Sequence, residues 1–228
     1  MTKVKTGFIL INKPSGISSH GVINHLRRLS GIKRIGHAGT LDPLASGLMI
    51  VAIGREYTKK LNNFIKLDKE YRADIFLGGI SPSYDGEQKI ISSYSGPKLK
   101  KKQIKEAITK YSGTISQRPP IFSAKKIKGQ RAYRLARQEK NFETNLQTIN
   151  ISGFKITSYR WPHLKAKVNC SSGTYIRSLA HDLGQTLGTG AYLYNLERTA
   201  INGFYLKKAV RLKNLNLKNI NKHIKTLL

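Results

Sequence analysis

The sequence predicts a single domain of the mixed α/β (α+β) class, built on a mainly antiparallel central sheet that helices flank. Residues 69–77 alternate apolar and polar side chains, which is the periodicity of a half-buried strand, and residues 48–53 form an apolar run typical of a buried strand. After Ser18 or Ser19, apolar residues recur at helical spacing instead. The chain shows no internal repeat and no clear linker, which favours one domain.

Hydrophobic spacing, turn residues and caps define the order of the elements. The first half is expected to hold a strand at 7–14 that runs into a Pro-Ser-Gly turn, a helix that ends at Gly31, the strand at 48–53, a short helix near 57–64, the strand at 69–77, a turn at 81–86, a strand at 88–95 paired antiparallel with 69–77, and a helix at 97–108. The second half adds strands at 146–160 and 164–170, a helix with Ser172 or Thr174 near its cap, a last strand at 190–199 and one amphipathic helix at 211–228.

The chain carries a large positive charge. Among its 228 residues, 41 are Lys or Arg and 12 are Asp or Glu, which gives a net charge of +29. In a compact fold, so many positive charges repel one another, and binding to a polyanion would offset this repulsion. Nucleic acid is therefore the leading partner and an anionic membrane surface the second. No apolar run approaches the roughly 20 residues that span a bilayer. The single cysteine, Cys170, leaves no internal disulfide and fits a reducing cytoplasm, where we expect the protein.

Acidic residues are scarce, and this limits the chemistry. The five Asp and seven Glu form no DxD or ExxE cluster, whereas two-metal phosphoryl transfer needs several converging carboxylates. The six His residues lack zinc-ligand spacing. We therefore expect no metal and no other cofactor, and any chemistry on nucleic acid to proceed without a metal.

The stretch at residues 34–47 isolates one carboxylate, Asp42, in a loop of glycine, small residues and proline, directly before the apolar strand at 48–53. A lone acid on such a loop can be a reactive group that the fold presents. The alternative is a turn in which Asp42 accepts backbone hydrogen bonds, because Asp-Pro is common in turns. On the loop alone, the turn is the better interpretation.

Four other side chains are candidates for binding. Tyr71 begins the strand at 69–77 on its buried side, where core packing is the ordinary role of a tyrosine. Tyr175 and Arg177 fall in the first turn of a helix, and a cation there opposes the helix dipole. Arg177 is therefore expected to pair with a specific negatively charged group, either a phosphate or a carboxylate. Lys13, just past the first strand, is either a phosphate contact or a solvated side chain.

Residues 118–137 interleave basic with aromatic and small residues, the composition of an RNA-contacting surface. Lys125, Arg131 and Tyr133 are the candidate contacts in this segment. The lysines at the start of the helix at 97–108 are better interpreted as a solvated face than as a backbone contact.

Four segments together resemble the bacterial tRNA pseudouridine synthase B family. Residues 36–47 (GHAGTLDPLASG) resemble its catalytic motif, and its other signature segments resemble residues 69–71 (KEY), 119–125 (PPIFSAK) and 173–184 (GTYIRSLAHDLG). They occur in the order of the family and extend over most of residues 7–205. Each segment alone is moderate evidence, and the four in order are strong.

The resemblance implies the pseudouridine synthase fold and conversion of uridine 55 in the tRNA T-loop to pseudouridine, without a cofactor. Asp42 falls on the catalytic aspartate, Tyr71 on the tyrosine that stacks on the target base, and Arg177 on the arginine that pairs with the aspartate. Three further positions, which contact or frame the flipped nucleotide, match His37, Tyr175 and Leu196. The implied partner is the T-stem-loop of tRNA, with no membrane and no obligate protein partner, and the protein is expected to be a monomer.

The expected organisation is a catalytic domain at residues 1–210, with an RNA-contacting insertion at about 117–145, followed by a basic helix at 211–228. The resemblance implies that the separate C-terminal RNA-binding domain of most bacterial members is missing. Residues 81–85 depart from the threonine- and aspartate-rich turn of the family. The alternative function is a catalytically inactive tRNA-binding protein or RNA chaperone on the same scaffold, and a basic ribosomal-type protein explains the charge but not the Asp42 loop.

Overall fold

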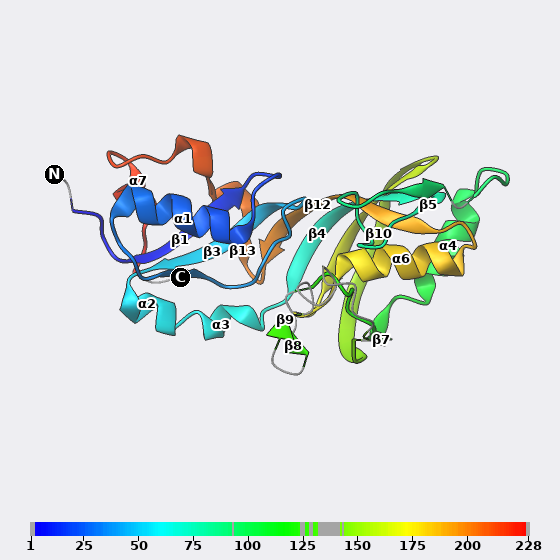
Figure 1. Cartoon of the computed structure of the whole chain (residues 1–228), viewed down its shortest axis with the longest axis horizontal. Coiled ribbons are helices and arrows are strands. Elements are labelled where there is room, and N and C mark those ends of the chain that lie inside the picture. The colour runs from blue at the N-terminus through cyan, green and yellow to red at the C-terminus, as the bar shows by residue number, and fades with distance from the viewer. Residues whose placement is uncertain are drawn as a thin grey trace. The chain divides into compact units, whose positions relative to one another are not determined.

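The computed structural model describes residues 3–92, 94–123, 126–127, 130–131, 142 and 144–226. These residues form two compact units: unit 1 holds residues 1–71 and 196–228, and unit 2 holds residues 72–195 (Figure 1). The chain passes from one unit to the other within strand β4 (Lys69–Leu77) and returns within strand β12 (Ala191–Ile201). Most of the described strand pairs are antiparallel and others are parallel, which confirms the predicted mixed sheet.

Unit 1 is built around two antiparallel strands, β1 (Gly7–Lys13) and β3 (Ser46–Ile53). Strand β2 (Ile35–His37) is antiparallel to β3, and β14 (Val210–Arg211) is parallel to β1. Strand β12 runs parallel to β3, and β13 (Phe204–Tyr205) is antiparallel to β12. The helices are α1 (Ser19–Ser30), α2 (Arg55–Lys59), α3 (Asn62–Ile65), the 3-10 turns η1 (Leu206–Lys208) and η2 (Leu212–Asn214), and α7 (Ile220–His223).

Strand β3 is buried on both faces, which explains its uninterrupted apolar sequence. One face, with Leu48 and Ile50, joins a core that also holds Phe8 and Tyr57. The rings of Phe8 and Tyr57 meet edge to face at 5.3 Å. In Figure 1, helices α1 and α2 flank these strands.

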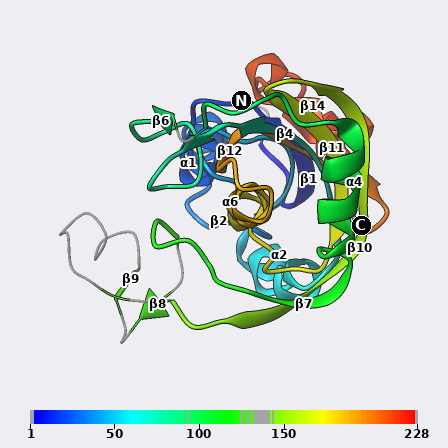
Figure 2. The ribbon, with the colours of Figure 1, turned by 90° about the vertical axis from the view of Figure 1, so that its right-hand side faces the viewer.

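Unit 2 carries the long antiparallel pair β10 (Gln147–Arg160) and β11 (His163–Cys170), with β7 (Gly113–Gln117) antiparallel to β10 and β4 beside β11. Two short hairpins pair β5 (Gly79–Ile80) with β6 (Ile91–Ser92), and β8 (Lys126–Ile127) with β9 (Gln130–Arg131). Helix α4 (Lys101–Thr109) packs against β10 and against α6 (Ile176–Thr186), as Figure 2 shows.

Several predicted elements match the structure closely. Strand β4 has the predicted bounds, and Ser18 caps α1 by accepting a hydrogen bond from the Gly21 N–H at 3.0 Å. Gly31 ends α1 at φ +71°, a left-handed conformation that glycine adopts without strain. Two predictions were wrong in detail. The single helix near 57–64 is the two short helices α2 and α3, and the strand at 88–95 is reduced to β6, which pairs with β5 instead of β4.

The predicted helix at 211–228 is wrong. The segment instead holds β14, η2 and the four-residue helix α7. The reason lies in its asparagines, because an Asn side chain competes with helical hydrogen bonding by bonding to nearby backbone. Asn216 Oδ1 accepts from the N–H groups of Lys218 and Asn219, and Asn219 Oδ1 accepts from the N–H of Asn216. In the described part of the chain, no helix is long and apolar enough to cross a membrane.

Candidate active site

The Asp42 loop, residues 39–47, is held to the start of α1 and to the turn before it. Ser19 Oγ accepts from the Leu41 N–H and donates to the Leu41 carbonyl, both at 2.8 Å. The Gly16 N–H donates to the Pro43 carbonyl at 2.8 Å, and Ser15 Oγ donates to the Leu44 carbonyl at 2.7 Å. Asp42 itself is partly exposed. The loop therefore has a fixed backbone that presents a carboxylate at the surface of unit 1.

Lys13 has a role that neither sequence interpretation included. Its side chain is fully buried, and its ammonium group donates to the carbonyls of Pro14, Ile17 and Pro43, at 3.0, 2.6 and 3.3 Å. The expectation of an RNA contact is therefore corrected to a structural role. A buried ammonium group needs such acceptors, and here they tie the turn after β1 to the Asp42 loop.

Arg198 supports the same loop from β12, and it is not among the site residues that the sequence predicts. Its guanidinium is buried and donates to the carbonyls of Leu48, Gly39 and Thr40 at 2.8, 3.1 and 3.5 Å. Gly47 makes this approach possible, because its φ is +111° and a Cβ there would overlap the backbone of Arg198. Arg198 alternates with the apolar residues Leu196 and Ala200 along β12, and this position on the apolar face is the signal that could have revealed it.

Three predicted site residues belong to unit 1, where His37 lies in β2, Tyr71 in β4 and Leu196 in β12. Burial, with the charge of Arg198 as the second cause, lowers the pKa of His37 below 6.5, so its imidazole is neutral at pH 7. Tyr71 is buried in β4. Leu196 is buried in β12, and its carbonyl accepts a hydrogen bond from Ser46 Oγ at 3.4 Å. The roles expected of these side chains toward a substrate stay predictions.

In unit 2, Arg177 forms an ion pair with a carboxylate, which is one of the two partners, phosphate or carboxylate, that the sequence left open. Arg177 Nη1 lies 3.2 Å from Asp85 Oδ2, and their side chains are only 6% and 1% exposed. The same guanidinium donates to the carbonyls of Ser83 and Phe122 at 3.1 and 2.9 Å. Asp85 Oδ1 accepts from Ser83 Oγ at 2.6 Å and from the Glu87 N–H at 3.0 Å. Asp85 was missed because its only sequence signal was a turn.

Asp42 and Arg177 belong to different units, and the pairing expected between them stays a prediction.

Tyr175 is the N-terminal cap residue of α6, in place of the predicted Ser172 or Thr174. Its backbone is held by Gln117, whose side chain accepts from the Tyr175 N–H at 2.8 Å and donates to the Tyr175 carbonyl at 3.0 Å. Thr174 Oγ1 donates to the Ser171 carbonyl instead of capping the helix. The start of α6, which carries Arg177, is thus fixed to the end of β7.

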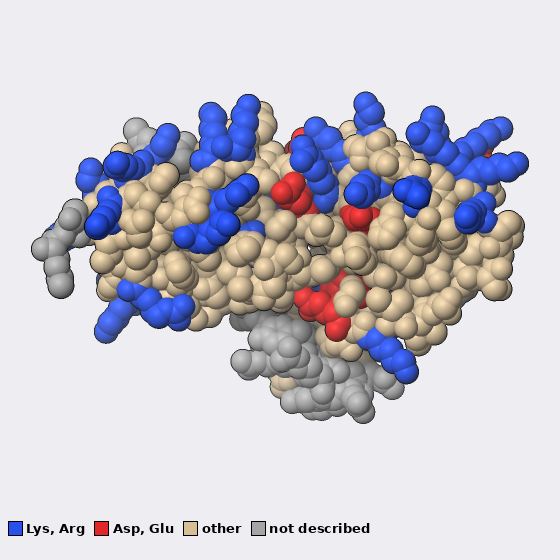
Figure 3. Space-filling view, turned by 90° about the horizontal axis from the view of Figure 1, so that it is seen from above, with Lys and Arg blue, Asp and Glu red and all other residues tan. Residues whose placement is uncertain are grey.

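Of the RNA contacts expected in the insertion, Arg131 belongs to strand β9, while Lys125 and Tyr133 lie outside the described residues. The beginning and the end of the insertion are joined. Arg118 Nη1 donates to the Thr144 carbonyl at 2.7 Å, and Thr144 Oγ1 donates to the Pro119 carbonyl. On the face that Figure 3 shows, Lys and Arg side chains are widely spread and Asp and Glu form small patches.

The fold itself has known counterparts. Over 96% of this chain, it is similar to a chain in the crystal structure of a Cbf5-Nop10-Gar1 complex, with a TM-score of 0.74 and 25% identity, and it spans 60% of the length of that chain. It is also similar to a chain in the archaeal box H/ACA sRNP Nop10-Cbf5 complex, with a TM-score of 0.70 and 23% identity. The chain has the pseudouridine synthase fold, as predicted.

Sequence relatives define the family. Residues 27–176 match the model of the TruB family pseudouridylate synthase, N-terminal domain. The tRNA pseudouridine synthase B of Protochlamydia amoebophila is 46% identical over 90% of this chain and 77% of its own length. The proteins of that name in Chlamydia felis and Clostridium tetani are 44% and 39% identical, over 92% and 96% of this chain and 88% and 75% of their own lengths. The chain therefore belongs to the TruB family of pseudouridylate synthases, which are isomerases, and the predicted family is confirmed.

Proposed function

We propose that this chain converts uridine 55 in the T-loop of tRNA to pseudouridine, with Asp42 as the catalytic group. The observation that carries the proposal is the Asp42 loop: a partly exposed carboxylate on a backbone that Ser19, Lys13 and Arg198 hold in place, in a family whose relatives are tRNA pseudouridine synthases. A fixed carboxylate is required, because catalysis depends on a geometry set before the substrate binds.

The reaction exchanges one bond to the ribose for another. The C1′–N1 bond breaks, the uracil rotates, and a C1′–C5 bond forms. The hydrogen of C5 leaves to solvent and N1 gains a proton, so the composition of the nucleotide is unchanged. Asp42 either attacks C1′ as a nucleophile or abstracts a ribose proton as a base.

The other site residues are proposed to receive the flipped nucleotide. Taking a base out of its stack costs a few kcal/mol, which stacking on Tyr71 would offset. His37, Tyr175 and Leu196 would frame the nucleotide, and the neutral imidazole of His37 suits a hydrogen bond to a base better than a phosphate contact. Arg177 would keep a nearby carboxylate ionised. Residues 1–210 form the proposed catalytic domain, and the insertion at about 117–145 the proposed grip on the T-stem-loop.

The test measures the release of tritium from labelled tRNA. Incubation with tRNA that carries tritium at uridine C5 should release one equivalent per tRNA with chelator present, and none from tRNA with cytidine at position 55. Asp42→Asn should lower the single-turnover rate by about 10²-fold or more while tRNA binding persists. The matched control is Asp68→Asn, an exposed carboxylate of the same unit, which should leave the rate unchanged.

Two further results decide the alternatives. A folded wild-type protein that binds tRNA but releases no tritium would favour the inactive tRNA-binding protein or RNA chaperone. Deuterium at ribose C2′ separates the roles of Asp42: a several-fold slower single turnover supports proton abstraction there, and an unchanged rate supports attack at C1′.

A further inference from the structure

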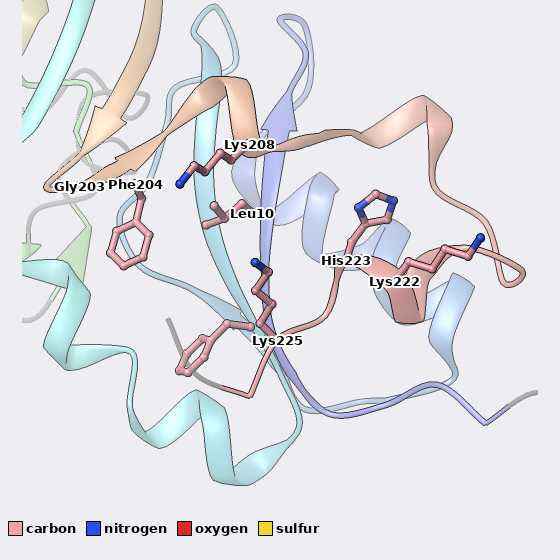
Figure 4. Close-up of a pocket in the computed structure, with 8 residues that line it drawn as sticks. Leu10, Gly203, Phe204, Lys208, Lys222, His223 and Lys225 are labelled. Carbon is pink, nitrogen blue, oxygen red and sulfur yellow. The ribbon is translucent and has the colours of Figure 1, made fainter.

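A pocket of about 300 Å³ opens in unit 1, and none of the described residues that line it belongs to the Asp42 loop. Phe8 and Leu10 of β1 and Phe204 of β13 are its apolar lining, and its polar lining is Lys208, Lys222, His223 and Lys225. In Figure 4, the side chains of Lys208 and Lys225 point toward the space beside Leu10 and Phe204, whereas Lys222 points away from it. We call it the C-terminal pocket.

The pocket has a firm frame. The backbone of Lys225 pairs with that of Phe8 through two hydrogen bonds, of 2.7 and 2.9 Å. Asn221 ties α7 to the N-terminal segment, since its side chain accepts from the Lys5 N–H and donates to the Lys3 carbonyl. The ring of Phe64 meets Phe8 at 5.1 Å and Phe204 at 5.8 Å, edge to face. The apolar lining and the backbone of Lys225 are therefore fixed relative to one another.

The described lining of the pocket carries positive charge and no negative charge that would neutralise it. It holds three lysines and a histidine, and no carboxylate is among the described residues that line it. Lys208 and Lys225 are exposed at its rim. Ammonium groups that converge on one space repel one another, and an anion between them would relieve this. The apolar lining distinguishes the pocket from the many solvated lysines elsewhere on the surface.

We propose that the C-terminal pocket binds one nucleotide of the tRNA, with its phosphate between Lys208 and Lys225 and its ribose or base against Leu10 and Phe204. The volume is at the lower end of the range of ligand pockets, about 300–1,000 Å³, which suits a single nucleotide. A phosphate with an aromatic ring matches both halves of the lining.

This contact positions the RNA without reading its sequence. Apart from His223, the lining offers no side chain that can both donate to and accept from a base edge. The inference rests on the proposed function for the identity of the RNA. The shared chemistry is that of a nucleoside 5′-phosphate, which tRNA or a free nucleotide could supply, and the experiment separates the two.

The first arm measures tRNA binding by the full chain across a range of salt concentrations. Lys208→Gln/Lys225→Gln should raise the Kd about three- to tenfold and reduce the slope of log Kd against log salt by roughly one phosphate contact, about 0.7–0.9. The matched control is Lys59→Gln/Lys213→Gln, two exposed lysines of the same unit outside the pocket, and it should change the Kd less than twofold.

The second arm uses uridine 5′-monophosphate and inorganic phosphate as probes, with NMR signals of the Phe204 amide and the His223 imidazole as readouts. Uridine 5′-monophosphate should shift both signals in wild type and not in the lysine variant. Phe204→Ala, followed at the His223 signal, should weaken the nucleotide but not inorganic phosphate.

The outcomes separate the two proposals. An unchanged Kd together with unmoved signals overturns the pocket assignment. A nucleotide that fills the pocket while tRNA binding is unchanged supports the nucleoside-phosphate site and overturns tRNA as its source. Inorganic phosphate that binds as well as the nucleotide overturns the role of the apolar lining. Wild-type protein that releases no tritium refutes the proposed function, while the binding arms still decide on the pocket.

Discussion

Replacing Asp85 with Asn tests whether its ion pair with Arg177 organises unit 2. Asn can keep the hydrogen bonds from Ser83 and the Glu87 N–H, because both use Oδ1. The change then removes the charge opposite Arg177 and places an amide donor where Oδ2 faced its guanidinium. At 3.2 Å and an effective dielectric constant of 20, the lost attraction is about 5 kcal/mol. Loss of one partner of a buried pair costs about 3–5 kcal/mol, and a chain of this size should then melt roughly 10 °C lower.

The assay is urea unfolding with the single-turnover rate measured in parallel, and the rate should fall because Arg177 would lose its anchor. The matched control is Asp74→Asn, whose pair with His163 at 2.9 Å is more exposed, with side chains 16% and 36% exposed, and should be worth at most about 1 kcal/mol. Asp85→Asn/Arg177→Met should recover part of the stability, because no unpaired charge remains buried. The reasoning is refuted if Asp85→Asn costs no more than the control and the double variant is additive.

Three further variants probe the loop and helix α6. Gly47→Ala should cost at least about 3 kcal/mol in urea unfolding, from strain and overlap with Arg198, against about 1 kcal/mol for Gly16→Ala, whose Cβ meets nothing within 4 Å; equal costs would contradict this. Lys13→Met should cost about 1–3 kcal/mol and slow single turnover without changing the Kd for tRNA, since the Asp42 loop loses a brace. Burial raises the pKa of Asp182 from 3.8 to about 6. Its protonation thus favours the folded state, and stability falls as pH rises through this range. Asp182→Asn should therefore be about 1 kcal/mol more stable than wild type at pH 8, allowing for solvent screening, and equal to it at pH 4.

The sequence predicted the elements whose pattern is local. Strand β4 follows from its alternation, β3 from its apolar run, and α1 from its spacing and the caps at Ser18 and Gly31. The helix expected at 211–228 failed because apolar spacing was weighed without the competing hydrogen bonds of its asparagines.

The sequence identified individual residues of the candidate site, but not the hydrogen bonds and ion pairs that connect them. Asp42, in its loop, and Arg177, opposed to its helix dipole, both stand out in the sequence. The acidic partner of Arg177 could not be found, because nothing near Asp85 in the sequence indicates that an arginine of α6 lies against it. The supporting roles of Lys13 and Arg198 were not predicted for the same reason: their acceptors are backbone carbonyls, which no residue type encodes.

The dependence of the Asp42 loop on Arg198 has a consequence for biosynthesis. The carbonyls of Gly39 and Leu48 receive their donors from a residue that lies 159 and 150 positions later in the chain. Contacts of such long sequence separation form late in folding. A nascent chain that has emerged from the ribosome only as far as α6 therefore lacks the donors of Arg198, although Ser19 and Lys13 already hold other parts of the loop. The loop that carries Asp42 gains these last supporting donors only when β12 is synthesised and added to β3, so its full set of contacts requires almost the whole chain.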